Sequence, residues 1–232
     1  MAFDYPRTRR RAMDYSIDAR TYRSPNHNAR PAAVSAIVIH TSEGQWDSDA
    51  EWLRSPKSGV SSHYIISPAG AIYQLVPEDR RAWHAGVSNY LGLSDWNDFS
   101  IGIELSHTAG TPRPAAQSGA LTWLAGQIIA RYKIAQRMVV AHRWIAQPAG
   151  RKVDPTDWPD ADLNAWIASL YSGPKVYQVL GLPVYQRQDL AGAVAGHLDS
   201  GAHVTIDATY GNGAGHLQSG LGFVDMDGLG EP

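Results

Sequence analysis

The chain has 232 residues, of which 44% are apolar and 18% charged, and its formal net charge is −2. A chain of this length can bury a sizeable core, and we expect one domain of ordinary size followed by a smaller one. The near-neutral charge excludes the broad basic surface with which proteins neutralise nucleic-acid phosphates, so no nucleic-acid partner is expected.

The sequence contains no cysteine, which excludes disulfides and thiolate metal ligands. The basic N-terminal residues are not followed by an apolar run, and no stretch of 18 apolar residues occurs anywhere. The sequence therefore predicts no signal peptide and no membrane insertion. We expect a monomer that is made in the cytoplasm.

The first third of the chain changes from polar to apolar. Residues 1–30 are rich in Arg, Asn and Pro, which predicts an N-terminal arm. Residues 34–40 are β-branched and almost continuously apolar, as in a strand covered on both faces. Residues 47–55 predict a short helix with Trp52 and Leu53 facing inward.

Further strands and helices alternate along the rest of the first domain. Residues 62–67 and 71–76 predict a hairpin, because a Pro-Ala-Gly turn separates two β patterns. Strands are also expected at residues 100–106 and 138–141, and apolar residues at helical spacing predict helices at 115–132 and 160–170. Strands interleaved with helices predict an α/β fold, with a mixed central β-sheet flanked by helices, over residues 31–172.

Two histidines and one aspartate occupy positions suited to a functional site. His40 and His142 each stand at the end of a predicted strand, where an α/β sheet presents side chains to a crevice. Asp154 precedes a proline, which favours extended backbone there. Two imidazoles and one carboxylate are a recurrent ligand set for catalytic zinc. A histidine at a strand end can also be a hydrogen-bonded structural residue, so spacing alone leaves both interpretations open.

The strand at residues 100–106 carries a carboxylate among apolar side chains. Alternation places its isoleucines and leucine on one face and Glu104 on the other. Such a carboxylate needs a partner or a function, so a structural salt bridge and a catalytic base are both open. The same alternation places His107 on the apolar face, and we do not expect it to bind metal.

Seven short segments between residues 24 and 170 carry a family resemblance. In chain order they are Ser24-Pro25-Asn26 with Asn28-Ala29-Arg30-Pro31, Ile37-Val38-Ile39-His40-Thr41, Ser62-His63-Tyr64-Ile65-Ile66, Trp83-His84-Ala85-Gly86, Ser100-Ile101-Gly102-Ile103-Glu104, His142, and Arg151-Lys152-Val153-Asp154-Pro155. Each is weak alone. Together, in this order, they resemble the zinc-dependent N-acetylmuramoyl-L-alanine amidases, a family that includes amidase-type phage lysozymes and the peptidoglycan recognition proteins.

The resemblance implies a reaction and a ligand set. The reaction is cleavage of the amide between N-acetylmuramic acid and the L-alanine of the peptidoglycan stem peptide. The implied Zn²⁺ ligands are His40, His142 and Asp154, while Glu104 would handle the proton of the attacking water and Lys152 would stabilise the oxyanion.

The resemblance also implies accessory residues. Family members differ in whether a tyrosine at the position of Tyr64 shares the acid/base role, and we expect Glu104 to take that role with Tyr64 as a positioning residue. The expected substrate-binding residues are His84, Trp83, Asn28 and Arg30. His84 either lines the substrate cleft or stacks on Trp83 to hold a loop.

One departure from the family concerns the interval between His142 and Asp154, which is a couple of residues longer than usual. The extra residues at 147–150 could displace Asp154. We expect the ligand set to form nevertheless, because loops tolerate insertions and Lys152 keeps its offset from Asp154.

The C-terminal residues 175–232 change to short β runs broken by glycines, which predicts a small all-β domain. Four segments in it resemble a bacterial SH3-like barrel, and they are Pro183-Val184-Tyr185, Gly196-His197-Leu198, the run from Gly201 to Ile206, and the run from Gly220 to Val224. Such a module would hold the enzyme on peptidoglycan, whereas the alternative is a β tail that only packs on the first domain.

The predicted role is that of a peptidoglycan hydrolase acting on the cell wall, either a phage endolysin or a bacterial lytic enzyme that reaches the wall through a holin or a secretion system. A non-catalytic peptidoglycan-binding protein of the same fold is the alternative, but such proteins typically lose a zinc ligand. A zinc peptidase of the stem peptide is less favoured because the sequence has no HExxH helix.

Overall fold

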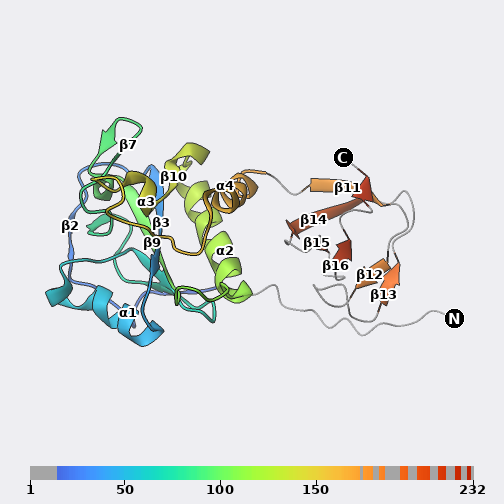
Figure 1. The fold of residues 1–232 in the computed structure, drawn as a ribbon, viewed down its shortest axis with the longest axis horizontal. Helices are drawn as coiled ribbons and strands as arrows, with labels where there is room; N and C mark the ends of the chain where they lie inside the picture. Colours follow the sequence, from blue (N-terminus) through green and yellow to red (C-terminus); the bar gives the residue numbers. More distant parts are fainter. Residues whose placement is uncertain are drawn as a thin grey trace. The chain divides into compact units, whose positions relative to one another are not determined.

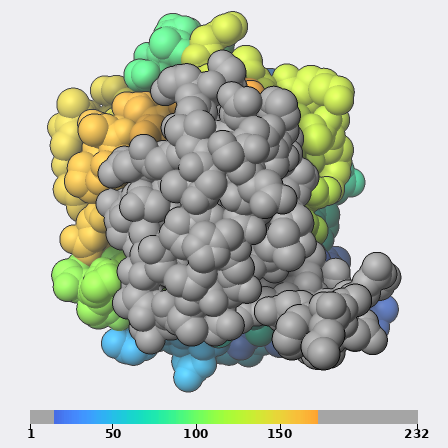
Figure 2. Space-filling model, turned by 90° about the vertical axis from the view of Figure 1, so that its right-hand side faces the viewer, coloured from blue at the N-terminus to red at the C-terminus, as the bar shows by residue number. Residues whose placement is uncertain are grey.

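The structure, a computed structural model, describes residues 15–172 and the strands within residues 175–230. The chain divides into two compact units, the first of which spans Met13–Tyr171. The coloured surface in Figure 2 belongs to residues 15–172, with the residues of the last helix in orange.

A six-stranded mixed sheet forms the centre of the first unit (Figure 1). Its strands, in spatial order, are β1 (Ile17–Asp18), β5 (Ile72–Gln74), β4 (Tyr64–Ile66), β9 (Ser100–Ser106), β3 (Ala36–Ser42) and β10 (Val139–Ala141). The β4–β5 pair is antiparallel, as expected for the predicted hairpin, and all other neighbours are parallel. The predicted mixed central sheet is therefore confirmed.

Helices cover the sheet, and the long ones begin and end close to the predicted residues. The helices are α1 (Trp46–Arg54), α2 (Ala115–Tyr132), α3 (His142–Ile145) and α4 (Asp160–Ser169), with short 3-10 turns η1 (Pro56–Ser58), η2 (Trp96–Asp98) and η3 (Gln136–Met138). Helices α2 and α4 pack on one face of the sheet, where Ile39 and Ile103 share a buried cluster with Leu121 and Leu163.

The opposite face of the sheet is covered by two smaller apolar clusters. One joins Val38 to Trp96 and Ile145, and the other joins Ile65 to Leu53 of α1. On this same face, alternation along the strands places His40 of β3 in register with Glu104 of β9. The polar residues of the predicted site therefore emerge on the face opposite to α2 and α4.

Two predictions about the early chain are wrong. Trp52 is 58% exposed, although Leu53 is buried as expected. The buried stripe of α1 runs through Asp49, Ala50 and Leu53, so Trp52 lies off that stripe. The segment expected to be an irregular arm contains β1 and also β2 (His27–Ala29), which pairs with β6 (Arg80–Ala82). Strands of two or three residues are too short to produce a periodic signal.

The remaining strands form two separate ladders. A small ribbon joins β7 (Asn89–Tyr90) to β8 (Leu93–Ser94). In the C-terminal part, seven strands pair antiparallel in the order β13 (Val194–His197), β12 (Pro183–Tyr185), β16 (Phe223–Asp225), β15 (Ala214–Leu217), β14 (His203–Thr209), β11 (Lys175–Val179) and β17 (Leu229–Gly230). The side chains and loops on which the SH3-like prediction depends lie outside the described residues, as does residue range 1–14 of the predicted arm. Within the described residues, no helix has the length and apolar character that crossing a membrane requires.

Candidate active site

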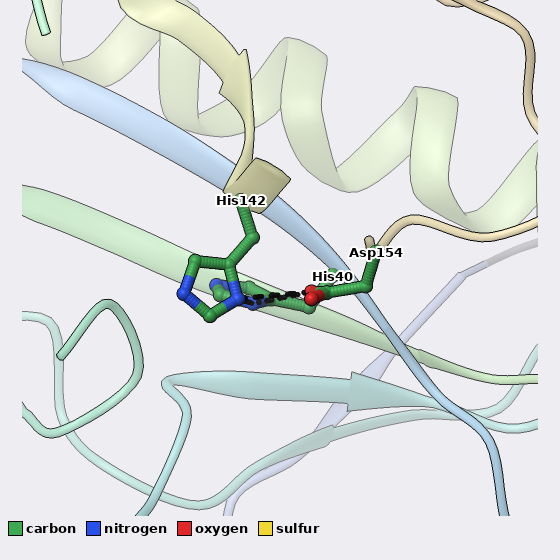
Figure 3. A group of neighbouring side chains, drawn as sticks. All are labelled: His40, His142 and Asp154. Carbon is green, nitrogen blue, oxygen red and sulfur yellow. Dashed lines mark hydrogen bonds and ion pairs between the residues drawn. The ribbon is translucent and has the colours of Figure 1, made fainter. Parts of the chain in front are cut away.

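Three donor atoms from distant parts of the chain converge on one point. The Nδ1 atoms of His40 and His142 are 3.0 Å apart, and Asp154 Oδ2 lies 3.1 Å from the first and 3.0 Å from the second. Both rings turn Nδ1 toward the carboxylate, as Figure 3 shows. All three residues are buried. The sequence prediction that these residues lie together is therefore confirmed.

Each member of the cluster is held by the main chain around it. His40 lies in β3, and His142 directly follows β10, whose Ala141 is in register with Ile39 of β3. The Asp154 carbonyl accepts a hydrogen bond of 2.8 Å from the Arg143 N–H. The next loop residue but one, Thr156, donates its N–H to Thr41 Oγ1 at 2.8 Å. The longer loop at residues 147–150 therefore does not displace Asp154.

This donor set fits a divalent metal ion. Ligand atoms bound to one tetrahedral ion at about 2.0–2.2 Å lie roughly 3.3–3.5 Å from one another, so the observed triangle would have to open by only a few tenths of an ångström. The three residues are also the one such group of metal-ligating side chains found in the described part of the chain. Two imidazoles and a carboxylate leave a fourth position for water or a substrate oxygen.

The surroundings of the cluster set the protonation states of His40 and Asp154. Burial and the neighbouring His142 lower the pKa of His40 to about 4, so its ring is neutral at physiological pH and its Nδ1 can bind metal. Burial alone would raise the pKa of Asp154, but its close contacts with His142 and His40 hold that pKa well below its usual range. The aspartate is therefore an anion.

Glu104 stands beside the cluster with a carboxyl group that can carry a proton. Its Oε1 lies 3.9 Å from His40 Nδ1, and its side chain is 13% exposed. Burial, followed by the negative charges of Asp154 and Asp49, raises the pKa of Glu104 well above its usual value. A carboxyl group with a raised pKa can act as a base in one step and an acid in the next.

Lys152 contributes positive charge from the surface. The side chain is exposed, yet its positive charge partly opposes the rise in the pKa of Glu104 and adds a small part to the lowering of the pKa of His40. The ammonium therefore lies within electrostatic reach of the cluster.

The prediction that Tyr64 is a positioning residue at the site is wrong. Tyr64 is in register with Ile103, whereas Ile65 is in register with Glu104, so alternation directs Tyr64 to the opposite face of the sheet. Its hydroxyl donates to Glu78 Oε1 at 2.8 Å, within the layer that α2 covers.

The residues expected to bind substrate lie in different surroundings. Arg30 directs its three side-chain nitrogens at main-chain carbonyls, including those of Glu78, Asp98 and Arg80 at 3.0, 3.1 and 2.8 Å. This engagement gives Arg30 a structural role and does not support the predicted substrate contact. Trp83 and Asn28 hydrogen-bond to each other, with Nε1 2.8 Å from Oδ1, near the exposed surface.

His84 lies against a histidine of the ligand cluster. The side chain is buried, and its Nδ1 lies 3.1 Å from the Nε2 atom of His40. Neither alternative of the sequence analysis, the substrate cleft or the stack on Trp83, included this contact with His40.

Sequence reasoning also missed several residues around the cluster. Asp49, buried in the first turn of α1, accepts hydrogen bonds from Ser42 and Ser106 at 3.0 and 2.7 Å. The Ala85 carbonyl accepts from His142 Nε2 at 3.1 Å and from Arg151 Nη2 at 3.1 Å. Asp49 gave no signal because acidic residues are common in the first turn of a helix. The Ala85 carbonyl gave none because every residue has a main-chain carbonyl.

Comparison with known proteins agrees with the fold and the cluster. The sequence model of the N-acetylmuramoyl-L-alanine amidase family matches residues 30–157. The 1,6-anhydro-N-acetylmuramyl-L-alanine amidase AmpD of Salmonella typhimurium strain SL1344 is 37% identical over 166 residues, which cover 62% of this chain and 88% of AmpD.

Solved structures extend the comparison to three dimensions. A crystal structure of a selenomethionine derivative of AmpD matches with a TM-score of 0.56 and 33% identity, covering 66% of this chain and 94% of that one. The structure of AmpDh3 from Pseudomonas aeruginosa in complex with an anhydromuramic pentapeptide matches with a TM-score of 0.52 and 29% identity, covering 70% of this chain and 68% of that one.

The chain therefore belongs to the N-acetylmuramoyl-L-alanine amidase family. It is an N-acetylmuramoyl-L-alanine amidase, an enzyme whose substrates derive from peptidoglycan.

Proposed function

We propose that this amidase depends on zinc, bound by His40, His142 and Asp154. The observation that carries the proposal is the convergence of three donor atoms within 3.1 Å of one another. A zinc ion bound there would supply a Lewis acid for the scissile carbonyl and an acidified water as nucleophile.

Glu104 is the proposed acid/base. Its carboxylate oxygen, 3.9 Å from His40 Nδ1, is close enough to the ligand cluster to accept a proton from the attacking water. The same oxygen would return that proton to the leaving nitrogen of L-alanine. The raised pKa of Glu104 supports this exchange, because it brings the two protonation states closer in free energy near neutral pH.

Lys152 is the proposed electrostatic partner of the developing oxyanion. Its positive charge acts on Glu104 and His40, so it would also act on an oxygen between them. The ammonium is exposed, and we expect its contribution to be smaller than that of Glu104 because solvent screens it.

Product analysis tests the zinc proposal and the bond that is cleaved. Purified peptidoglycan is digested with the full chain, with and without a chelator, and the products are identified by mass spectrometry. New L-alanine amino termini without new reducing sugar ends are the expected products. Chelation should abolish them and added zinc should restore them, whereas cleavage that resists complete metal removal would overturn the zinc proposal.

The proposed substrate in the cell is the intact wall, as for a phage endolysin or a bacterial lytic enzyme. Support comes from the antiparallel C-terminal strands, which lie beyond residues 30–157 that match the family model and are proposed to form an SH3-like wall-binding module. AmpD is named for 1,6-anhydro substrates, which makes soluble muropeptides the competing class.

Two substrates separate these roles. The full chain is assayed on insoluble sacculi and on a soluble anhydromuropeptide, and the Glu104→Gln chain is used to measure sedimentation with sacculi without digestion. A wall enzyme should sediment and should digest sacculi efficiently. Turnover of the soluble muropeptide alone, without sedimentation, would overturn the wall role.

A further inference from the structure

The segment Trp83–Gly86 touches both histidines of the ligand cluster, although it supplies no ligand itself. His84 Nδ1 lies 3.1 Å from His40 Nε2, and the Ala85 carbonyl lies 3.1 Å from His142 Nε2. Each imidazole therefore has Nδ1 at the cluster and its second nitrogen against one of two consecutive residues. Such outer contacts fix the tautomer and the orientation of a metal-binding histidine.

The hydrogen-bond direction at His84 follows from the chemistry of His40. If the Nδ1 lone pair of His40 binds metal, its Nε2 carries the proton and donates to His84 Nδ1. The proton of His84 must then be on Nε2, which lies 3.3 Å from Ser100 Oγ. Ser100 in turn donates its hydroxyl proton to the Trp96 carbonyl. This series of hydrogen bonds ends on a main-chain carbonyl, which can only accept, so the donor and acceptor in each bond are fixed.

The position of His84 is itself built into the fold. The N–H groups of His84 and Ala85 both donate to Asn97 Oδ1, at 2.9 and 2.7 Å. The ring lies over Gly102 of β9, where an added Cβ would come within 2.5 Å of His84 Cγ. Gly102 therefore leaves the space that the His84 ring occupies.

We propose that His84 is a positioning residue that acts through His40, holding its ring in the tautomer that presents Nδ1 to the metal, with Ser100 as the next link. This inference rests on the proposed metal site. It assigns the segment Trp83–Gly86 a role in shaping the metal site in place of the predicted contact with substrate.

Zinc affinity is the readout that separates positioning from substrate contact. The dissociation constant for zinc is measured by competition with a chromophoric chelator in full-length chains. Replacing His84 with Phe keeps a planar ring but removes both nitrogens, and we expect zinc affinity to fall by about 10-fold to 100-fold. His84→Asn restores an acceptor near the Nδ1 position and should recover most of the loss.

Two further variants guard against a simple folding defect. Ser100→Ala removes the acceptor of the His84 proton and alters the structure less than His84→Phe does. We expect it to lower zinc affinity by a smaller factor than His84→Phe. His27→Phe, in β2, removes a histidine that accepts from Arg80 Nε at 3.3 Å and lies outside the ligand cluster, so it should leave zinc affinity unchanged. Thermal melting of each variant monitors folding.

A spectroscopic measurement tests the tautomer directly. Nitrogen-detected NMR of the zinc-loaded chain should show His40 protonated at Nε2, and His84→Phe should alter that signal. If wild-type chain binds zinc and folded His84→Phe and Ser100→Ala bind it equally well, the positioning role is overturned while the zinc proposal stands. If wild-type chain binds no zinc, the proposed function itself fails.

Discussion

Strands β3 and β9 direct alternate side chains to the two faces of the sheet, and only one of these faces carries ionisable groups. One face packs Ile37, Ile39 and Ile103 against α2 and α4. The other presents His40 and Glu104 to the metal-ligand cluster. The comparison shows that burial of the apolar side chains stabilises the sheet. That stability keeps the ionisable groups of the other face in place, although several of them would be more stable in water.

The largest expected effect is on the polar face, from Glu104→Gln. We expect turnover to fall by about 10²-fold to 10⁴-fold, the usual range for a positioned acid/base, because the amide cannot exchange the proton. Zinc affinity and the melting temperature should change little. Steady-state kinetics on a defined muropeptide measures the loss.

A matched control for this variant is Glu51→Gln. Glu51 is a carboxylate of α1 with a side chain that is 56% exposed and paired with Arg54. Its replacement should leave turnover unchanged. A Glu104→Gln enzyme with turnover within tenfold of wild type would remove Glu104 from the proton transfer.

On the apolar face, Ile103→Ala should lower stability and leave turnover almost unchanged, the opposite of the effect of Glu104→Gln. The side chain is fully buried, and its truncation should lower the free energy of unfolding by about 2–5 kcal/mol. Turnover per folded molecule at low temperature should stay near the wild-type value. Urea unfolding and active-site titration measure the two quantities.

The milder Ile103→Val serves as the graded control, with an expected cost of about 0.5–1.5 kcal/mol. If turnover falls together with stability in Ile103→Ala and Ile103→Val, packing on the apolar face also controls catalysis on the polar face.

Acid should lower the free energy of unfolding through a buried histidine on the polar face. Burial and the Arg30 guanidinium lower the pKa of His63 to about 3, while the unfolded chain binds a proton at this residue near pH 6.5. The unfolded state therefore binds more protons as pH falls, so stability is fully present above pH 6.5 and decreases toward pH 3. For His63 alone, the loss between pH 6.5 and 5 is about 2 kcal/mol.

Urea unfolding of metal-free chain at pH 7.5 and pH 5 measures this loss. His63→Gln should lower stability at both values but should shrink the difference between them. An unchanged pH difference in the variant would show that His63 is protonated in the folded state as well.

The smallest expected effect comes from Lys152→Met at the exposed edge of the site. Loss of the ammonium should lower turnover by roughly tenfold, less than for a buried oxyanion donor, because solvent screens the charge. The effect should diminish as salt is raised. Kinetics at two ionic strengths measures it, and a variant with wild-type turnover at low salt would contradict the oxyanion role.

Much of this architecture could be predicted from local sequence. The helix at Ala115–Tyr132 begins and ends at the predicted residues because its apolar side chains recur at helical spacing. The strand at Ser100–Ser106 was likewise predicted with its correct bounds, since its pattern alternates. The ligand set was predicted with the help of the family resemblance, because local patterns do not reveal which distant residues meet in the fold.

The errors at the site share one cause, which is pairing between distant segments. Tyr64 lies on the strand next to that of Glu104, but only the register of β4 with β9 reveals that its side chain belongs to the opposite face. A shift of one residue would have reversed the outcome. The role of His84 depends on a contact with a residue 44 positions away, and no local pattern encodes it.

The Arg151 guanidinium ties the long loop between His142 and Asp154 to its neighbour. It donates to the carbonyls of Gln147, Ala85 and Val87 at 2.7, 3.1 and 2.8 Å. The tip of this loop, residues 148–150, is exposed and lies beyond these anchors. The tip can therefore be varied or lengthened at Ala149 with little strain on the ligand triangle, whereas Gly150, with a φ of +81°, has to stay glycine.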